Sequence, residues 1–262
     1  MPLDHTASPV RTARITDLRK TLHGLDAPEI LRVSLGSSAT GRMAVVSSFG
    51  ADSVVLLHML AQIDPATVVL FVDTQMLFPE TLAYQQDVAR ALGLLNVRQI
   101  RARPQNLHRG DPDDALHKTD TDACCDLRKT APLEQALAGF DSWITGRKRF
   151  QSDTRAALEV VETEQGRIKI NPLAGWQATD LLDYIAAHDL PRNPLVAKGF
   201  PSIGCAPCTS AVRVGEPSRA GRWRGHEKHE CGIHFSNGPA VRATAPPGAP
   251  APASEAQERI AR

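Results

Sequence analysis

The sequence contains no long apolar run and almost no excess of one charge. No segment approaches the roughly 18 apolar residues that a membrane-spanning helix requires. The 30 lysine and arginine residues nearly balance the 29 acidic residues, for a net charge of +1, whereas a nucleic-acid-binding domain usually carries a clear basic excess. The N-terminus, "MPLDHTASPV", lacks the charged and apolar regions of a secretory signal. We therefore expect a cytoplasmic, globular protein that binds neither membranes nor nucleic acids.

Cysteine is also scarce, with five residues in a chain of 262. In the cytoplasm thiols stay reduced and structural disulfides are rare, so these cysteines are expected to be metal ligands or reactive thiols. Cys124 and Cys125 are adjacent in "DACCDLRKTAP", and neighbouring cysteines cannot easily form a disulfide with each other. Cys205 and Cys208 have C-x-x-C spacing in "GCAPCT". The chain thus presents two cysteine pairs and one isolated cysteine, Cys231.

The two cysteine pairs together offer four soft ligands. Four thiolates suit either a tetrahedral zinc ion or an iron–sulfur cluster. Structural zinc sites usually combine two C-x-x-C turns, whereas a cluster with separate iron corners gives adjacent thiolates different atoms to bind. The spacing therefore favours a [4Fe–4S] cluster, with zinc as the alternative, and the predicted ligands are Cys124, Cys125, Cys205 and Cys208.

Apolar segments alternate with helical patterns along most of the chain. "MAVVSSFG" and "TVVLFVDT" are typical of buried strands, and each is followed by a helical pattern. Strands are expected over residues 43–50, 67–74, 96–102, 142–148 and 166–176, the last at an edge, and helices over 14–36, 53–63, 79–92 and 177–188. Such alternation indicates right-handed crossovers. It predicts an α/β fold: an open, mainly parallel twisted sheet with helices on both faces, plus a cysteine-rich C-terminal segment.

The composition changes after Pro191. The stretch "PRNPLVAKGFPSIGCAPCT" is rich in proline and glycine, which is typical of loops. Residues 241–262 are rich in alanine and proline and cannot bury enough apolar surface to fold alone. We expect residues 1–240 to form a single domain with an N-terminal helical layer, followed by a disordered tail over 241–262.

The segment "SSFGADS", residues 47–53, connects a predicted strand to a predicted helix. Open α/β sheets bind ligands at this position, and the N–H groups at a helix N-terminus favour an anion. The loop is not a Walker loop, because no G-K-[ST] follows. Ser48, Gly50, Asp52 and Ser53 instead match the S-x-G-x-D-S loop of the ATP-pyrophosphatase-like (adenine nucleotide alpha-hydrolase-like) superfamily.

The next predicted strand ends in "VDT". Parallel strands end at the same edge of a sheet, so Asp73 and Thr74 are expected beside the segment of residues 47–53, near an adenosine. Cys231 lies far from both, in "EKHECGIHF". Neighbouring cations such as Lys228 and His229 lower the pKa of a thiol and increase its thiolate fraction. A reactive role for Cys231 therefore has a chemical basis.

Taken together, the "SFGADS" loop, "VDT", the two cysteine pairs and "ECGIH" resemble the assimilatory sulfonucleotide reductases. They are most similar to the cluster-bearing, thioredoxin-dependent adenylyl-sulfate (APS) reductases, and the resemblance extends from about residue 30 to residue 236. It implies reduction of APS to sulfite and AMP in assimilatory sulfate reduction. It also implies that Cys231, on a mobile C-terminal segment, attacks the substrate sulfur and that thioredoxin releases sulfite from the S-sulfonate.

The resemblance also implies a set of substrate-binding residues. APS carries a sulfate and a phosphate, so its site needs fixed cations and donors that meet the charge developing on the leaving AMP. Beyond the loop and strand-end residues, the matching positions are Lys129 beside the cysteine pair, Gly146, Arg147 and Arg155 in "TGRKRFQSDTR", and Arg219 and Arg222 in "RAGRW". Since no thioredoxin-like domain follows Cys231, the electron donor is expected to be a separate protein. A homo-oligomer is also expected.

Three alternatives remain at this stage. A reductase of the 3′-phosphorylated substrate, PAPS, or one with dual specificity, is the nearest, although PAPS-specific members generally lack the cluster cysteines. An ATP-consuming sulfur-transfer or tRNA-thiolation enzyme would release pyrophosphate and would not need "ECGIH". A nucleotide-responsive iron–sulfur redox sensor would carry out no turnover, which the isolated Cys231 argues against.

Overall fold

The computed structural model describes residues 9–225, 228 and 230. Six strands form one sheet in the order β3-β2-β1-β4-β6-β5. Neighbouring strands are parallel except β5, which runs antiparallel to β6. The strands are β1 Met43–Ser47, β2 Val68–Val72, β3 Val97–Ile100, β4 Ser142–Thr145, β5 Val161–Glu164 and β6 Arg167–Ile170. The predicted fold class, an open and mainly parallel sheet, is confirmed.

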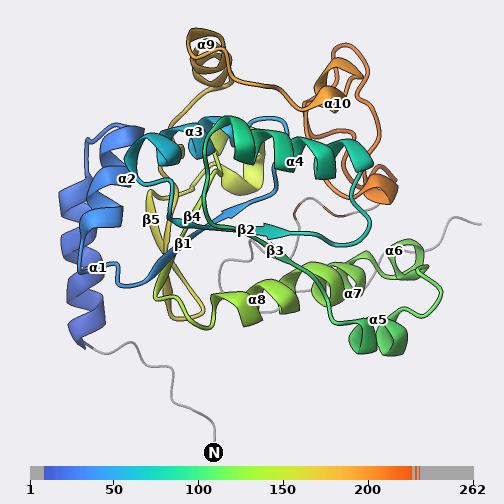
Figure 1. Cartoon of the computed structure of the whole chain (residues 1–262), viewed down its shortest axis with the longest axis horizontal. Coiled ribbons are helices and arrows are strands. Elements are labelled where there is room, and N and C mark those ends of the chain that lie inside the picture. The colour runs from blue at the N-terminus through green and yellow to red at the C-terminus, as the bar shows by residue number, and fades with distance from the viewer. Residues whose placement is uncertain (1–8, 226–227, 229, 231–262) are drawn as a thin grey trace, which may run out of the picture.

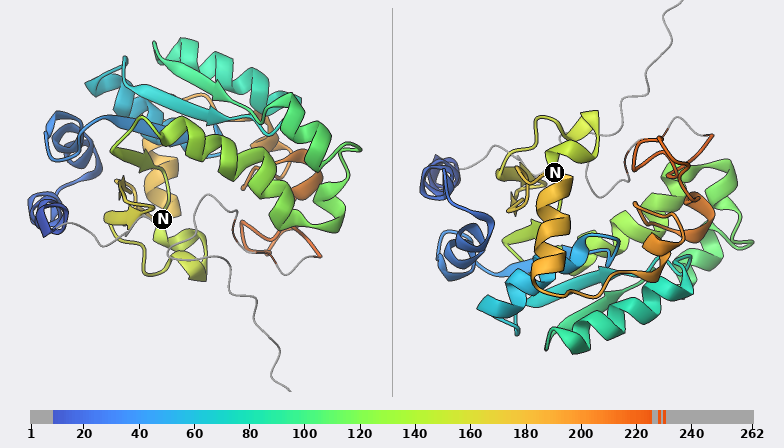
Figure 2. Two further views of the ribbon diagram at one scale, coloured as in Figure 1. Left: turned by 90° about the horizontal axis from the view of Figure 1, so that it is seen from below. Right: turned by 90° about the horizontal axis from the view of Figure 1, so that it is seen from above.

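Helices cover both faces of this sheet. Helices α3 and α4 lie over one face and α8 over the other, and α1 and α2 lie beside the β5 end (Figure 1). Figure 2 shows the same layers from below and from above. The helices are α1 Pro9–Leu22, α2 Ala27–Gly36, α3 Ser53–Ile63, α4 Pro79–Ala91, α5 Pro104–Gly110, α6 Leu116–Thr119, α7 Thr121–Cys125, α8 Ala131–Leu137, α9 Ala178–Ala187 and α10 Pro194–Ala197. None of the helices in the described ranges is long and apolar enough to cross a membrane.

The core has two parts because successive side chains of a strand point to opposite faces. Ala44, Leu70 and Trp143 pack against α8 on one face. Val45 and Phe71, which follow Ala44 and Leu70 in sequence, belong to the larger cluster on the α3 face. Strands buried on both faces appear as continuous apolar runs, which is why β1 and β2 were predictable.

The N-terminal helical layer consists of two helices, not one. Gly24, with a φ of +77°, lies in the turn between them. Asp26 then begins α2: its carboxylate accepts a hydrogen bond from the Glu29 backbone N–H at 2.8 Å, and the Glu29 carboxylate accepts one from the Asp26 N–H at 3.3 Å. This reciprocal capping stabilises a new helix start and separates α2 from α1.

The prediction that residues 166–176 form an edge strand is wrong. β6 lies between β4 and β5, and β5 is the edge strand. Gln165 and Gly166 connect β5 to β6 with φ values of +49° and +79°. Tight hairpins need two such residues and usually use Asn-Gly or Asp-Gly, so the Gln-Gly pair gave a weak turn signal and β5 was missed.

Candidate active site

The loop that joins β1 to α3, residues 48–52, is called the phosphate loop below. Its conformation lets a ligand approach the backbone closely. The Ser53 hydroxyl accepts a hydrogen bond from the Gly50 N–H at 3.0 Å. A Cβ atom at Gly50 would lie 3.3 Å from the Ser48 hydroxyl, which is tighter than most such contacts, so the loop needs a glycine there. The Asp52 side chain makes no capping hydrogen bond to α3, and its carboxylate is turned to another partner.

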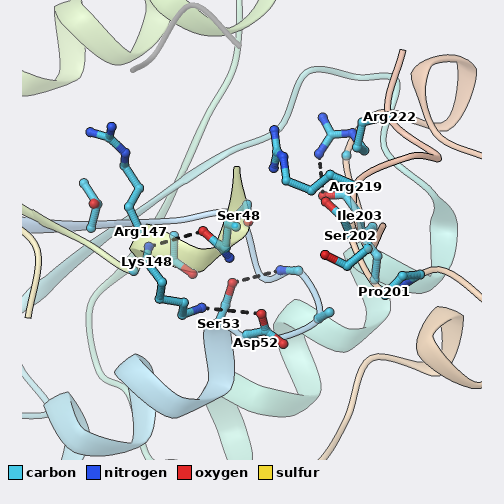
Figure 3. Close-up of a pocket in the computed structure, with 18 of the residues that line it drawn as sticks. Ser48, Asp52, Ser53, Arg147, Lys148, Pro201, Ser202, Ile203, Arg219 and Arg222 are labelled. Carbon is cyan, nitrogen blue, oxygen red and sulfur yellow. Dashed lines mark hydrogen bonds and ion pairs between the residues drawn. The ribbon is translucent and has the colours of Figure 1, made fainter. Parts of the chain in front are cut away.

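That partner is Lys148, which is not among the predicted substrate-binding residues. Its Nζ lies 3.4 Å from the Asp52 carboxylate, and only 3% of its side chain is exposed (Figure 3). Burial lowers the pKa of Lys148, and the charge of Asp52 partly opposes this shift. Lys148 stands at the first arginine position of the T-G-x-R-R pattern in "TGRKRFQSDTR", so a basic residue at that position was the available signal.

A cavity of about 350 Å³ lies against this loop. It is lined by residues that follow β1, β2 and β4. The chain runs outward from β1 to β2 and β3 and then returns to β4 on the other side of β1, and the carboxyl ends of the strands at such a change of direction are a usual ligand position. Eleven of the predicted substrate residues line it: Ser48, Gly50, Asp52, Ser53, Thr74, Lys129, Gly146, Arg147, Arg155, Arg219 and Arg222. The structure therefore brings together segments that are far apart in sequence.

Asp73 is not among the lining residues. Its carboxylate is 2% exposed at the side chain and accepts hydrogen bonds from Arg101 Nε at 2.8 Å and Gln99 Nε2 at 2.9 Å. It also accepts one from the Gln75 N–H at 2.8 Å. These contacts give Asp73 a role in holding the end of β2, and they turn its carboxylate toward protein donors.

Arg147 enters the cavity from the loop after β4. Its Nη1 donates to the Glu162 carboxylate at 3.2 Å, and the same carboxylate accepts a hydrogen bond from Asn171 Nδ2 at 2.8 Å. Asn171 in turn accepts one from the Thr145 hydroxyl at 2.6 Å. Burial lowers the pKa of Arg147, and the charge of Glu162 partly offsets that effect. The β4, β5 and β6 strands thereby hold this guanidinium at one wall of the cavity.

Arg222 lies at the opposite wall of the cavity, where its guanidinium packs over the ring of Trp223. Its guanidinium lies 4.4 Å from the centre of the Trp223 ring, a favourable cation–π distance. Its Nη1 donates to the Ile203 carbonyl at 3.3 Å (Figure 3). A Cβ atom at Gly204 would lie 2.3 Å from Arg222 Nη2, so the glycine provides the space in which the guanidinium lies.

The four cysteines of the two pairs line a second, smaller cavity. Cys124 and Cys125 come from the end of α7, where the helix continues as a π-helical turn over Asp126–Thr130; such turns are frequent at functional sites. The C-x-x-C turn is held at the end of β2 by the Ala206 N–H, which donates to the Met76 carbonyl at 2.7 Å. Segments separated by about eighty residues are thus placed around one cavity.

The second cavity shares part of its wall with the first. Thr74, Lys129, Cys205, Arg222 and Trp223 line both. Burial, reinforced by the neighbouring thiol of Cys125, raises the pKa of Cys124 to about 12. Among the residues that the structure describes, no group of three or more His, Cys, Asp and Glu side chains is arranged to hold a single metal ion.

The C-terminal segment is described at two points, Lys228 and Glu230. Lys228 Nζ donates to the Thr121 carbonyl at 2.9 Å, at the start of the cysteine-bearing helix α7. The Glu230 carboxylate accepts a hydrogen bond at 2.7 Å from Nη2 of Arg155, which lines the first cavity. Cys231, the predicted nucleophile, and the predicted tail over 241–262 lie outside the described residues.

Comparison with known proteins gives consistent matches. The phosphoadenosine phosphosulfate reductase domain matches residues 42–211. A protein of Mesorhizobium japonicum (strain LMG 29417 / CECT 9101 / MAFF 303099) named adenosine 5′-phosphosulfate reductase is 49% identical over 237 residues, 90% of this chain and 93% of that protein. One of the same name from Chelativorans sp. (strain BNC1) is 50% identical over 195 residues, 74% and 80% of the two chains.

A solved structure extends the likeness to three dimensions. The crystal structure of phosphoadenylyl-sulfate (PAPS) reductase from Candida auris, in a phosphate complex, matches with a TM-score of 0.63 and 29% identity, covering 76% of this chain and 96% of that one. The domain match spans β1 to the C-x-x-C turn and includes most of the residues that line both cavities, whereas Arg219, Arg222 and Trp223 follow it. The resemblance seen in the sequence motifs is confirmed, and this chain belongs to the phosphoadenosine phosphosulfate reductase family.

Proposed function

We propose that the protein reduces adenylyl sulfate (APS) to sulfite and AMP. The observation that carries this proposal is the wall shared by the phosphate-loop cavity and the four-cysteine cavity, which contains Lys129, Thr74 and Arg222. A nucleotide bound at the loop would extend its anhydride toward that wall. The relatives named adenosine 5′-phosphosulfate reductase support the same substrate.

The phosphate loop and the cavity cations would bind the two anionic groups of APS. The loop supplies N–H groups and small residues around Gly50 for the adenylyl phosphate. Lys129, Arg147, Arg155, Arg219 and Arg222 line the same space. Fixed cations of this kind stabilise the negative charge that develops on the departing AMP phosphate.

Cys231 is the proposed nucleophile. Its thiolate attacks the sulfur of the sulfate group; a sulfur–sulfur bond forms, the bond from that sulfur to the bridging oxygen breaks, and AMP leaves with the electron pair. An external dithiol of the thioredoxin type then attacks the Cys231 sulfur and releases sulfite. Its second thiol frees Cys231, so the dithiol is oxidised to a disulfide as the sulfonate is reduced to sulfite.

The four cysteines of the second cavity would hold a [4Fe–4S] cluster. Their donor chemistry fits, because four thiols from two separate segments line one enclosed space. When bound, the cluster supplies fixed charge that orders the neighbouring substrate site and does not itself carry electrons in turnover. Thr74, Lys129 and Arg222 line both cavities and are among the side chains that separate the two sites.

The remaining parts of the proposal concern the setting of the reaction. Reduced cysteines and a thioredoxin-type donor are consistent with a cytoplasmic protein, which we propose to act as a homo-oligomer. Residues 1–240 would form one domain whose mobile C-terminal segment carries Cys231, and residues 241–262 a disordered tail.

PAPS reduction, alone or beside APS reduction, is the second candidate, because the Candida auris relative is a PAPS reductase. Sulfite release from APS and from PAPS with thioredoxin distinguishes the two. Faster turnover of APS is expected. The Cys231→Ser variant should release no sulfite while retaining the visible absorbance of the cluster. A strong preference for PAPS, or full activity of Cys231→Ser, would contradict the proposal.

A further inference from the structure

Glu230 immediately precedes Cys231 in the sequence, and its carboxylate forms an ion pair with Arg155, a residue that lines the phosphate-loop cavity. Arg155 Nε donates to one carboxylate oxygen at 2.6 Å and Arg155 Nη2 to the other at 2.7 Å. The Ser152 hydroxyl donates to the first oxygen at 3.1 Å. Only 12% of the Glu230 side chain and 7% of the Arg155 side chain are exposed. This is a buried two-point ion pair, a geometry that fixes both partners.

The same carboxylate also contacts a second guanidinium. Arg219 Nη2 lies 3.5 Å from Glu230 Oε2, and the arginine side chain is largely buried. Arg155 and Arg219 both line the phosphate-loop cavity. Glu230 therefore occupies cations that an anionic ligand in the cavity would also need.

Glu230 is ionised at neutral pH. Burial alone would raise the pKa of its carboxyl group, but the hydrogen bonds and charge of Arg155 outweigh burial, so the pKa of Glu230 lies below its usual value. A buried charge of this kind is stable only while its partner remains in place. Removing the Glu230 charge would release Arg155 and Arg219 for another anion.

Lys228 attaches the same segment at a second point. Its Nζ lies 2.7 Å from the Asp122 carboxylate and 7% of its side chain is exposed. It also lies 5.6 Å from the centre of the Trp223 ring. Lys228 thus joins the segment to α7, and Glu230 joins it to the loop after β4. The two contacts therefore hold Lys228 and Glu230 against different elements, shortly before Cys231 in the sequence.

We propose that Glu230 is a positioning residue for Cys231 and an internal counter-ion that competes with the anionic substrate for Arg155 and Arg219. This proposal rests on the proposed function, in which the sulfate of APS also binds Arg155 and Arg219. Glu230 draws the nucleophile-bearing segment onto the site. The incoming sulfate then competes with Glu230 for the two arginines, and this competition weakens substrate binding, while the contact with Arg155 keeps the residue next to Cys231 at the site.

Opposite effects on binding and on reaction rate follow from this double role. Glu230→Gln removes the competing charge, so an anionic nucleotide should bind more tightly. The same change weakens the contact that docks the segment, so the transfer of the sulfonate to Cys231 should slow. A residue with a merely structural role would lower both affinity and rate.

ADP is a suitable probe of affinity, since it carries a terminal phosphate where APS carries its sulfate and offers no sulfur to attack. Calorimetric titration of the full-length protein should show that Glu230→Gln binds ADP about fivefold or more tightly than the native chain. Rapid-quench measurement with saturating APS should show that the sulfonate forms about tenfold or more slowly. Steady-state KM and kcat for APS should therefore both fall.

Glu216→Gln is the matched control. Glu216 pairs with Arg224 at 2.8 Å on the outside of the same C-terminal part, and neither residue lines the cavity; its ADP affinity and sulfonation rate should equal the native values. An unchanged or weaker ADP affinity in Glu230→Gln, or an unchanged sulfonation rate, would overturn the inference. If the native protein formed no sulfonate with APS, the proposed function would fail, and the ADP titrations would still decide whether Glu230 competes with an anion.

Discussion

The Thr74 hydroxyl lies 3.1 Å from the Cys205 sulfur. Thr74 lies two residues after the end of β2, and it lines both cavities. One small side chain therefore connects the C-x-x-C turn to the nucleotide side of the sheet. Because the hydroxyl also accepts a hydrogen bond from the Met76 N–H at 3.3 Å, its position is set by the backbone of the turn that holds the cysteines.

Thr74→Val should therefore weaken binding of the proposed cluster without unfolding the protein. Valine has the shape of threonine but cannot make the contact with sulfur, and one hydrogen bond contributes about 0.5–1.5 kcal/mol. The visible absorbance of the cluster should be lost about threefold or more faster in the presence of a chelator. Thr163→Val, at an exposed position of β5, should behave like the native protein; equal rates in all three proteins would contradict the role of Thr74.

Gly204→Ala should displace the Arg222 guanidinium. The added Cβ would lie 2.3 Å from its Nη2, and a flexible side chain can move away where backbone cannot. We expect ADP affinity to fall about threefold or more, because a cation leaves the cavity wall, with little change in thermal stability. Gly36→Ala is the control, since nothing lies within 4 Å of a Cβ there. Native ADP affinity in Gly204→Ala would show that Arg222 does not contribute.

Lys148→Met should weaken nucleotide binding more strongly. It removes a buried cation and leaves the Asp52 carboxylate, 3.4 Å away, without its partner at the phosphate loop. Truncating one member of a buried charge pair has a large effect, so ADP affinity should fall about tenfold or more. Lys198→Met removes a lysine that pairs with Glu80 at 2.7 Å but is 58% exposed, and should leave affinity unchanged. Equal affinities in the two variants would refute the role of Lys148.

The loop and strand residues of the site were predictable from sequence because each carries a local signal. Ser48, Gly50 and Ser53 are small residues at a strand-to-helix junction, and the apolar runs before them define β1 and β2. The cysteine pairs were found by spacing alone. These signals depend only on residues close in sequence, so they can be recognised before the fold is known.

Other parts depend on contacts between distant segments and could not be predicted. Asp73 directly follows β2, but the donors that hold its carboxylate are Gln99, on β3, and Arg101, just after β3. Lys148 is one of several basic residues in its loop, and only its burial against Asp52 distinguishes it. The Glu230–Arg155 pair joins positions 75 residues apart. Nothing local marks the partners of Asp73 or the Glu230–Arg155 pair, and for Lys148 the sequence pattern indicates only a basic residue.

A histidine outside the site gives a test by pH. His58 on α3 bonds the Tyr184 hydroxyl at 2.9 Å and lies 4.7 Å, ring to ring, from His188. Burial, and then the charge of His188, lower the pKa of His58 from 6.5. Below pH 6.5 His58 is protonated more readily in the unfolded chain than in the folded chain. The free energy of unfolding should therefore fall as the pH drops through and below 6.5.

The change in urea midpoint between about pH 7.5 and about pH 5.5 measures this effect. The decrease should be smaller in His58→Gln than in the native protein, because glutamine does not titrate. His23→Gln changes an exposed histidine in the turn after α1 and should keep the native pH dependence. A decrease in His58→Gln as large as that of the native chain would refute the effect of His58.

Attack of Cys231 on the sulfur of APS is the central step of the proposed reaction. Mass spectrometry of the protein after mixing with APS, with no reductant present, tests it most directly. The account predicts the gain of one SO₃ group on the peptide that contains Cys231, release of one AMP for each adduct, and loss of the adduct when reduced thioredoxin is added. An unmodified Cys231 after AMP release, or an adduct on another cysteine, would contradict the account.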